Sequence, residues 1–356
     1  MSYQTGSSAE AVYKRFDMKR VLVSVAVVLA MLIPVIVHQQ VYVLFVVAEF
    51  FVFAIVALSL DLLLGRSGQI SLGQSGFFAV GAYTAALLNV RFGWEIVSCI
   101  CGAAIVASLS SLILGLPATR LRGHYLGIVT LGFGIGVAQI ALTWSALTGG
   151  DEGIHLAGTR LLFWSFADPS RLYYLCFAGL VAVVFGMNAL GRSRIGRSFA
   201  AVRDSEIAAA AMGIPVARTK VLAFVFSAAL AGAGGALFAF LNGFIAPEDF
   251  GFSQTLLFFA MVVLGGMSST AGVICGTFVV QVVEQSAATV SGLSLTLLGA
   301  AIVAAVLFLP GGIASLGERI GPWGGGWSRV RAREPRLAEP SAGQAGNSAV
   351  GTHAAV

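Results

Sequence analysis

Charged residues are scarce in this sequence. Only 10% of its 356 residues are Asp, Glu, Lys or Arg, whereas 58% are hydrophobic. A soluble domain carries about 25% charged residues and about 45–50% apolar ones. Sixteen acidic and 21 basic side chains are too few to cover the surface of a soluble protein of this length. The composition therefore excludes a soluble enzyme and a disordered protein, and it is typical of a polytopic membrane protein.

Lysine is rare, and the common nucleotide-binding and hydrolytic motifs are missing. None of the three lysines follows a glycine, so the sequence contains no G-x-x-x-x-G-K-[ST] loop for nucleotide phosphates. The motifs H-E-x-x-H and G-x-S-x-G are missing too. The four cysteines lie in or beside apolar runs, without metal-ligand spacing. We therefore expect no catalytic residue, no metal and no cofactor, and any ATP hydrolysis would need a separate subunit.

Long apolar runs are what the sequence does contain. A straight helix needs about 20 residues to cross about 30 Å of hydrocarbon. Two of the runs are shorter and lie next to glycines, which makes them candidates for broken or re-entrant helices. We predict an all-α integral membrane protein with about ten (eight to ten) transmembrane helices. The ten runs cover residues 21–37, 41–64, 75–90, 96–117, 125–147, 172–190, 221–242, 254–266, 271–290 and 293–309, and the short ones are 75–90 and 254–266.

The basic residues fall mainly on one side when the predicted helices alternate across the membrane. With a cytoplasmic N-terminus, 18 of the 21 bases lie on the cytoplasmic side, and only Arg91, Arg160 and Arg171 lie outside. This is the asymmetry that the positive-inside rule describes. We therefore predict that both termini are cytoplasmic. The net charge of +5 then reflects membrane topology, and no nucleic-acid partner is needed to explain it.

The polar stretches divide the chain into parts. Residues 1–20 form a predicted cytoplasmic N-terminal segment, and residues 21–315 form the transmembrane domain. Within that domain, residues 148–171 form an external loop and residues 191–220 a cytoplasmic loop. Residues 322–356 are rich in Gly, Ala, Pro and Arg and show no apolar period. We predict that they form a disordered cytoplasmic tail.

The segment from Gly65 to Thr84 combines five glycines with many polar side chains. Non-helical backbone is tolerated at membrane depth only where it is buried in protein or lines a watery cavity. A helix that begins near Ser75 would point its N-terminal N–H groups at the carboxylate of a substrate. The alternative is a cytoplasmic hairpin whose glycines only let helices pack closely. The predicted pathway residues are Ser67, Gln69, Ser71, Gln74, Ser75, Tyr83 and Thr84.

The cytoplasmic loop contains an alanine-rich stretch that predicts a single helix of about 15 residues. Ser198 is its predicted N-cap, and Gly213 followed by Pro215 is its predicted end. The small side chains and the charges form a compact docking surface for another protein. The alternative is an amphipathic helix resting on lipid, which its few large apolar residues disfavour. The predicted docking residues are Arg203, Asp204, Glu206, Ala208, Ala209 and Gly213.

Three carboxylates fall inside the apolar runs: Glu49, Asp61 and Glu284. Ionisable groups within a membrane are functional candidates by default. Asp61 lies near the inner end of its run, where Arg66 can pair with it. The three are either proton carriers of an ion-coupled secondary transporter or buried pathway and packing groups.

Several segments occur together in one known family. They are Gly68–Gln74 with Gly81–Thr84, Arg122–Leu126 with Thr130–Gly134, Thr148–Gly153, Arg203–Ile214 and Val263–Gly272. Together, over about residues 40–315, they resemble the membrane permease subunits of bacterial branched-chain amino acid (LIV-type) ABC importers. The resemblance is closest to the M-type subunit of the permease pair.

The cytoplasmic loop looks like the EAA coupling loop by which importer permeases dock on their ATPase. The general pattern is E-A-A-x-x-x-G. Anchored on Gly213, this chain has Ile207-Ala208-Ala209, and its acidic residue is displaced to Glu206. The resemblance also implies the bacterial inner membrane, a second permease subunit in a heterodimer, two ATPase subunits and an external substrate-binding protein.

The implied function is import of amino acids, branched-chain ones first, that a binding protein delivers. Permeases of this kind for other ligands, such as urea or amides, remain an alternative within the family. The predicted binding-protein side carries Gly149, Gly150, Asp151 and Glu152, where the two glycines allow a tight turn. From other classes, an ion-coupled secondary transporter of a small polar solute remains open, whereas an intramembrane enzyme lacks any nucleophile–base pattern.

Overall fold

The computed structural model describes residues 40–118, 124–156, 160–161, 164–165 and 169–287, and single residues at positions 34 and 299. The predicted N-terminal segment, the runs 21–37 and 293–309 and the tail 322–356 lie outside the described residues, apart from those two single positions. The count of about ten spans therefore stays a prediction.

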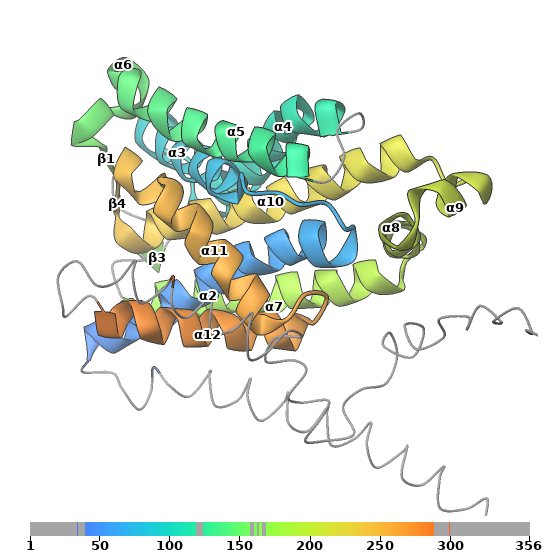
Figure 1. Cartoon of the computed structure of the whole chain (residues 1–356). Coiled ribbons are helices and arrows are strands. Elements are labelled where there is room, and N and C mark those ends of the chain that lie inside the picture. Colours follow the sequence, from blue (N-terminus) through green and yellow to red (C-terminus); the bar gives the residue numbers. More distant parts are fainter. Residues whose placement is uncertain are drawn as a thin grey trace, which may run out of the picture. The chain divides into compact units, whose positions relative to one another are not determined.

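Helices make up most of the described chain (Figure 1). Eight of the ten predicted runs coincide with helices, and within the described residues five helices are long and apolar enough to cross a membrane. The main helices are α2 (Val41–Asp61), α3 (Gln74–Phe92), α4 (Ile96–Ala118), α5 (His124–Thr143), α7 (Pro169–Arg192), α10 (Val216–Asn242), α11 (Phe252–Gly265) and α12 (Thr270–Ala287). The five spanning helices are α2 with its extension to Arg66, α4, α5, α7 and α10.

Short elements join the main helices. The short helices are the π-helix η1 (Leu62–Arg66), α6 (Ser145–Thr148), η2 (Gly150–Glu152), α8 (Arg194–Asp204), α9 (Glu206–Ala211) and η3 (Pro247–Phe250). The strands are β1 (Ile154–His155), β2 (Arg160–Leu161), β3 (Trp164–Ser165) and β4 (Phe244–Ile245). β1 pairs antiparallel with β4, and β2 with β3. The prediction of a helical membrane protein is confirmed, and the four two-residue strands are an addition to it.

The run 75–90 is not broken within itself, because α3 is one continuous helix of 19 residues; a re-entrant placement of this run stays a prediction. Its glycines do not break it; they let it lie against its neighbours. The non-helical backbone falls before α3, from Ser67 to Gly73. A helix therefore begins where the sequence predicted one, at Gln74 beside Ser75.

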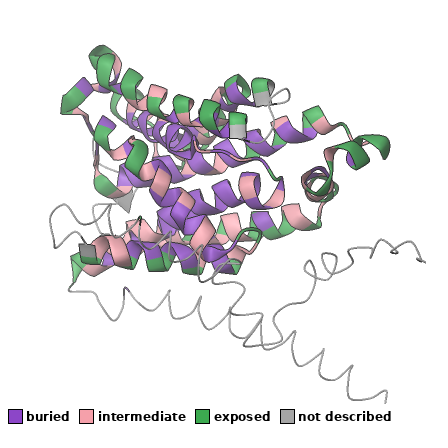
Figure 2. Cartoon of the chain, in the orientation of Figure 1, coloured by how far each residue is buried: buried purple, intermediate pink, exposed green. Residues whose placement is uncertain are grey.

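Helices α2 and α10 form the centre of the bundle. About 67% of the apolar window of α2 and 61% of that of α10 is buried, against 28% for α4 and α5 and 17% for α7. Figure 2 shows the same contrast between the inner and outer helices. The outer helices α4, α5 and α7 carry exposed apolar side chains such as Ile113, Ile128 and Phe185. This burial pattern fits a bundle whose outer helices face lipid.

Glycines bring α3 and α10 into direct backbone contact. A Cβ atom on Gly81 would collide with the backbone of Gly232, and one on Gly235 would collide with the carbonyl of Phe78. Gly232 in turn faces Ala103 and Ala107 of α4. In a membrane, helix association depends on such close packing of small residues, because lipid is as apolar as the helices.

Most of the described basic residues gather at one end of the bundle. This basic end carries Arg66, the C-terminus of α7, helices α8 and α9, and the N-terminus of α10 (Figure 1). The opposite end carries α6, η2, β1, β4 and η3. There Arg91 donates a hydrogen bond to the carbonyl of Ala146. The ends match the predicted alternation of loops, and which end is cytoplasmic stays a prediction.

The prediction of one helix over residues 198–212 is wrong, because the segment folds as α8 and α9. Ser205 adopts an extended conformation between them, and its Oγ accepts a hydrogen bond from the N–H of Ala208. The cap of α8 is Ser193, whereas Ser198 lies inside that helix. A serine side chain can bond to nearby backbone groups in place of the helical hydrogen bonds, and it is favoured at helix N-termini. Ser205 therefore ends one helix and caps the next within the alanine-rich stretch. Gly213 ends the segment as predicted, with φ +80°.

Because α3 and α10 touch through their backbones, Gly81→Ala should destabilise the protein. Overpacking a close helix contact costs about 1–3 kcal/mol. The matched control is Gly186→Ala, a helical glycine of α7 with nothing within 4 Å of the added Cβ. The measurement is the midpoint of thermal unfolding in detergent. Equal midpoints for the two variants would contradict the direct contact.

Candidate functional site

Most of the non-helical segment from Ser67 to Gly73 lies within the bundle: Ser67, Gln69, Ser71 and Gly73 are buried, whereas Ile70 and Leu72 are half-buried and Gly68 is exposed. Its backbone groups are paired with other elements: the N–H of Gln69 bonds to the carbonyl of Leu63, and that of Leu72 to Oγ1 of Thr130. Gly68, at φ +72°, lies against Arg203, where a Cβ atom would approach the Arg203 side chain to 2.7 Å. The segment thus meets the requirement that irregular backbone in a membrane be enclosed by protein.

Gln74 ties three helices together. Its Nε2 donates to Oγ of Ser59 in α2 at 2.5 Å and to Oγ of Ser227 in α10 at 3.0 Å. Ser227 in turn donates to the carbonyl of Ser59. The neighbouring Ser75 shares a 2.6 Å hydrogen bond with Thr255 of α11. The structure therefore places two predicted pathway residues at the crossing of α2, α3, α10 and α11.

The remaining predicted pathway residues have more local surroundings. Gln69 donates to Ser67 and to the carbonyl of Lys220, and Thr84 donates to the carbonyl of Val80. Tyr83 lies farther along α3, buried against Phe250. The amide oxygens of Gln69 and Gln74 and the hydroxyl of Tyr83 have no hydrogen-bond partner among the described residues. The set of predicted residues thus forms one group at the start of α3 and a second around Tyr83.

Asp61 is a fully buried carboxylate at the basic end. Its Oδ1 accepts a 2.6 Å hydrogen bond from the N–H of Ser268, and its Oδ2 lies 3.4 Å from Nε of Arg66. The predicted pairing of Asp61 with Arg66 is confirmed. Arg66 also donates to the carbonyl of Met187 in α7 and to Oγ1 of Thr270 in α12. One ion pair therefore joins α2, α7, α12 and the turn between α11 and α12.

Arg203 joins α8 to the same place. Its Nη1 donates to the carbonyl of Gly65 at 2.8 Å and to Oγ of Ser268 at 3.0 Å. Ser268 donates to the same carbonyl at 2.6 Å and holds a left-handed conformation, with φ +70°. Arg203 also pairs with the exposed Asp204 at 3.2 Å. We call Asp61, Gly65, Arg66, Arg203 and Ser268 the basic-end cluster.

The other predicted docking residues lie on α9 and around it. Glu206 pairs with Lys220 of α10 at 2.7 Å, which anchors α9 to the bundle. Ala209 is buried, whereas Ala208 and Gly213 are exposed. Two residues that the sequence reading did not select stand out: Ile207 is 79% exposed and Met212 is 83% exposed. Their signal in the sequence is that they are the large apolar residues of an otherwise small-residue stretch.

The predicted binding-protein side, next to α6 and β1, lies at the opposite end of the bundle from α8 and α9 (Figure 1). Gly149 and Gly150 have φ values of +78° and +60°, so the predicted tight turn is present. Asp151 and Glu152 follow it in η2 and are exposed. The turn is held near the end of α10, because Ile154 of β1 pairs with Ile245 of β4.

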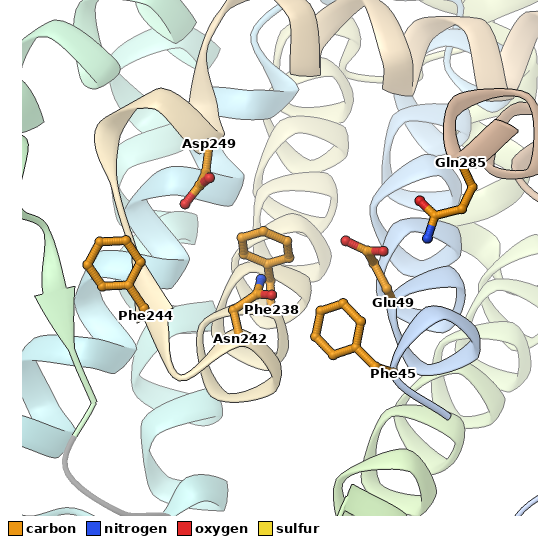
Figure 3. A pocket seen from close by; sticks show the side chains of 7 residues that line it. All are labelled: Phe45, Glu49, Phe238, Asn242, Phe244, Asp249 and Gln285. Atoms are coloured by element: carbon orange, nitrogen blue, oxygen red, sulfur yellow. The ribbon is translucent and has the colours of Figure 1, made fainter. Parts of the chain in front are cut away.

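A cavity of about 440 Å³ lies at the end of the bundle that carries β4 and η3 (Figure 3), and it was not predicted from the sequence. Its lining comes from α2, α10, β4, η3 and α12, so no single stretch of sequence signals it. The lining residues are Phe45, Glu49, Phe238, Asn242, Phe244, Asp249 and Gln285. The described residues hold no group of three or more His, Cys, Asp or Glu side chains that fits a metal ion.

Apolar helices long enough to cross a bilayer, a polar non-helical segment before α3 and helices that project from one end are typical of a polytopic membrane protein. The sequence profile described as branched-chain amino acid transport system / permease component matches residues 42–309. The chain belongs to this family. It is therefore a multi-pass inner-membrane protein and a permease subunit of an ABC transporter, not an enzyme.

Permease proteins of two transport systems are among its relatives. The chain is 37% identical over 286 residues to the high-affinity branched-chain amino acid transport system permease protein LivM of Escherichia coli (strain K12), which covers 74% of this chain and 67% of LivM. It is 24% identical over 249 residues to LivH of the same organism, covering 65% of this chain and 80% of LivH. It is 31% identical over 169 residues to the autoinducer 2 import system permease protein LsrC of Enterobacter sp. (strain 638), covering 46% and 49%. No solved structure matches the chain.

Asp61→Ala should strongly destabilise the protein, because it leaves Arg66 without its partner and removes the acceptor of the Ser268 N–H. Breaking a buried ion pair from one side costs about 3–5 kcal/mol. Asp204→Ala is the matched control, since it removes an exposed pair worth about 0–1 kcal/mol. Unfolding midpoints in detergent measure both. A loss no larger for Asp61→Ala than for Asp204→Ala would show that the basic-end cluster does not hold the helices together.

Proposed function

We propose that this chain is the M-type permease subunit of an importer for branched-chain amino acids. The observation that carries the proposal is the 37% identity to LivM over 286 residues, which exceeds the 24% identity to LivH. In this assembly the chain pairs with a second, LivH-like permease, and two ATPase subunits and an external binding protein complete the importer. An ion-coupled mechanism, the alternative that Glu49 and Glu284 left open, is not that of the family.

Helix α9 is the proposed contact with the ATPase. It projects beyond the helical bundle at the basic end (Figure 1) and presents Ile207 and Met212 to solvent. Large apolar side chains exposed outside the membrane mark protein interaction sites. The small residues Ala208 and Gly213 beside them let a groove approach the helix closely. Asp204 is exposed and Glu206 partly so, and both add charge at the rim of this surface.

In this proposal Arg203 transmits movement from the ATPase contact on α9 to the helical bundle. A movement of α8 and α9 displaces the guanidinium that holds the carbonyl of Gly65 and the hydroxyl of Ser268. Those two groups belong to the end of α2 and to the turn before α12. ATP-driven motion is thereby passed to two helices of the bundle through direct hydrogen bonds.

The start of α3 is the proposed place where the helices change partners during transport. The hydrogen bonds from Gln74 to Ser59 and Ser227 hold the start of α3 against α2 and α10. The free amide oxygens of Gln69 and Gln74 are acceptors that a solute or a rearranged helix can use. Ser67, Ser71, Ser75, Tyr83 and Thr84 belong to the same proposed pathway.

The turn from Gly149 to Glu152 is the proposed contact with the binding protein. Its exposed carboxylates lie at the end of the bundle opposite to α9, as an importer requires. The pairing of β1 with β4 fixes this turn beside the cavity at that end.

The proposed function has a direct test. The chain is expressed with its partner permease, ATPases and binding protein in cells that lack branched-chain amino acid transport, and uptake of labelled leucine, valine and isoleucine is measured. We expect ATP-dependent uptake of these amino acids and no uptake of urea. Uptake of urea instead of amino acids would refute the proposed substrate class.

The ATPase contact has a separate test. Ile207→Asp combined with Met212→Asp should lower the amount of ATPase that co-purifies with the permease by about tenfold, since tenfold corresponds to about 1.4 kcal/mol and two buried anchors exceed that. Ile195→Asp is the control, because Ile195 is an exposed apolar residue at the start of α8. If the double variant retains as much ATPase as the control, α9 is not the contact.

A further inference from the structure

The cavity at the end opposite to α9 combines carboxylates, amides and aromatic rings. In Figure 3, Phe238 and Asn242 of α10 lie between Asp249 of η3 on one side and Glu49 of α2 on the other. Phe45 and Phe244 complete the aromatic part of the lining, and Gln285 adds a second amide. The volume of about 440 Å³ accommodates a small solute.

The two carboxylates are held by neutral groups. Glu49 accepts a hydrogen bond from Nε2 of Gln281 at 3.2 Å through its Oε2 atom. Asp249 accepts one from the N–H of Ala246 at 2.9 Å through its Oδ2 atom. These bonds fix both side chains and leave the second oxygen of each without a hydrogen bond within the described part of the chain.

The cavity has no cationic partner of its own among the described residues. The ion pairs of the described residues lie instead at the basic end of the bundle, where they join Arg66 to Asp61, Arg203 to Asp204 and Lys220 to Glu206. Glu284 of α12 is a further carboxyl group in the neighbourhood of Glu49. Carboxylates in a largely apolar setting are costly unless a positive group pairs with them. The cavity is therefore complementary to a solute that brings a positive charge.

The rest of the lining determines which kind of cation fits. The rings of Phe45, Phe238 and Phe244 offer apolar surface beside the charge, and the Asn242 amide offers a donor for a carboxylate. A branched-chain amino acid carries all three matching groups: an ammonium, a carboxylate and an apolar side chain. Urea and neutral amides carry no ammonium group, so they form no ion pair with a carboxylate.

We propose that this cavity receives the substrate after its release from the binding protein, and that Glu49 binds its α-ammonium group while Asp249, on the other side of Phe238 and Asn242, adds to the negative potential of the cavity. This inference rests on the proposed function and adds the residues that recognise the substrate class. The ammonium contact selects amino acids as a class. The phenyl rings discriminate weakly among leucine, isoleucine and valine, since a methylene is worth only about 1–3 kcal/mol.

Isosteric variants test the proposal without removing the structural bonds. Glu49→Gln keeps an oxygen for Gln281, and Asp249→Asn keeps one for the N–H of Ala246. The control is Glu248→Gln, which removes an exposed carboxylate next to Asp249. The complete importer is reconstituted in liposomes, and leucine uptake and ATP hydrolysis are measured with saturating, leucine-loaded binding protein.

We expect the double variant Glu49→Gln, Asp249→Asn to lose about tenfold or more of its leucine uptake, because charge-assisted hydrogen bonds are lost. ATP hydrolysis stimulated by the loaded binding protein should stay near the wild-type rate, since docking and coupling lie elsewhere. Glu248→Gln should transport like the wild type, and Glu49→Asp should retain more uptake than Glu49→Gln.

Three results overturn the inference. Wild-type uptake by the double variant would show that the carboxylates do not bind the substrate. A parallel loss of uptake and ATP hydrolysis would assign them a structural role. Leucine uptake driven by a pH gradient without ATP, and abolished in the variants, would make them proton carriers. If the wild-type importer itself takes up no amino acid, the proposed function fails, and that outcome is distinct from these three.

Discussion

A carboxylate without access to water must be held by protein groups, and Asp61 shows how much of this structure depends on that constraint. The N–H of Ser268 and the guanidinium of Arg66 occupy its two oxygens. Arg66 then reaches α7 and α12, and Ser268 stands next to the carbonyl that Arg203 binds. The bonds that satisfy this one buried charge thus join α2, α7, α12, the turn between α11 and α12 and the projecting α8–α9 segment.

Helix α2 connects the two ends on which the proposed function depends. Asp61 lies at its basic end, whereas Glu49 lies near its other end in the cavity lining. Between them its residues are almost completely buried, and the helix packs against α7, α10, α11 and α12. Because the helix is enclosed, a displacement at the basic-end cluster cannot be absorbed locally by lipid or solvent. It must be accommodated by neighbouring helices or passed along the helix toward Glu49.

The helices could be predicted because each apolar run is a property of a continuous stretch of sequence. The Asp61–Arg66 pair was predictable for the same reason, since five residues separate its members. The break between α8 and α9 was missed because Ser205 offers a cap that outweighs the alanine propensity around it. The cavity was missed because Asp249 and Asn242 are about 200 residues from Glu49, and only the packing of α2, α10 and α12 brings them together. Arg203 was predicted as a docking residue, but its hydrogen bonds to Gly65 and Ser268 could not be predicted, because both partners are far from it in the sequence.

The hydrogen bonds of the start of α3 also set the order in which the chain can be completed during synthesis. Gln74 is bonded to Ser227, 153 residues later, and Ser75 to Thr255, 180 residues later. At about 5–20 residues per second, α3 waits about 10–30 s for those partners. Until then its polar groups must stay with water, the translocon or an insertase. Biogenesis of this permease therefore includes a period in which α3 is made but not yet enclosed by α10 and α11.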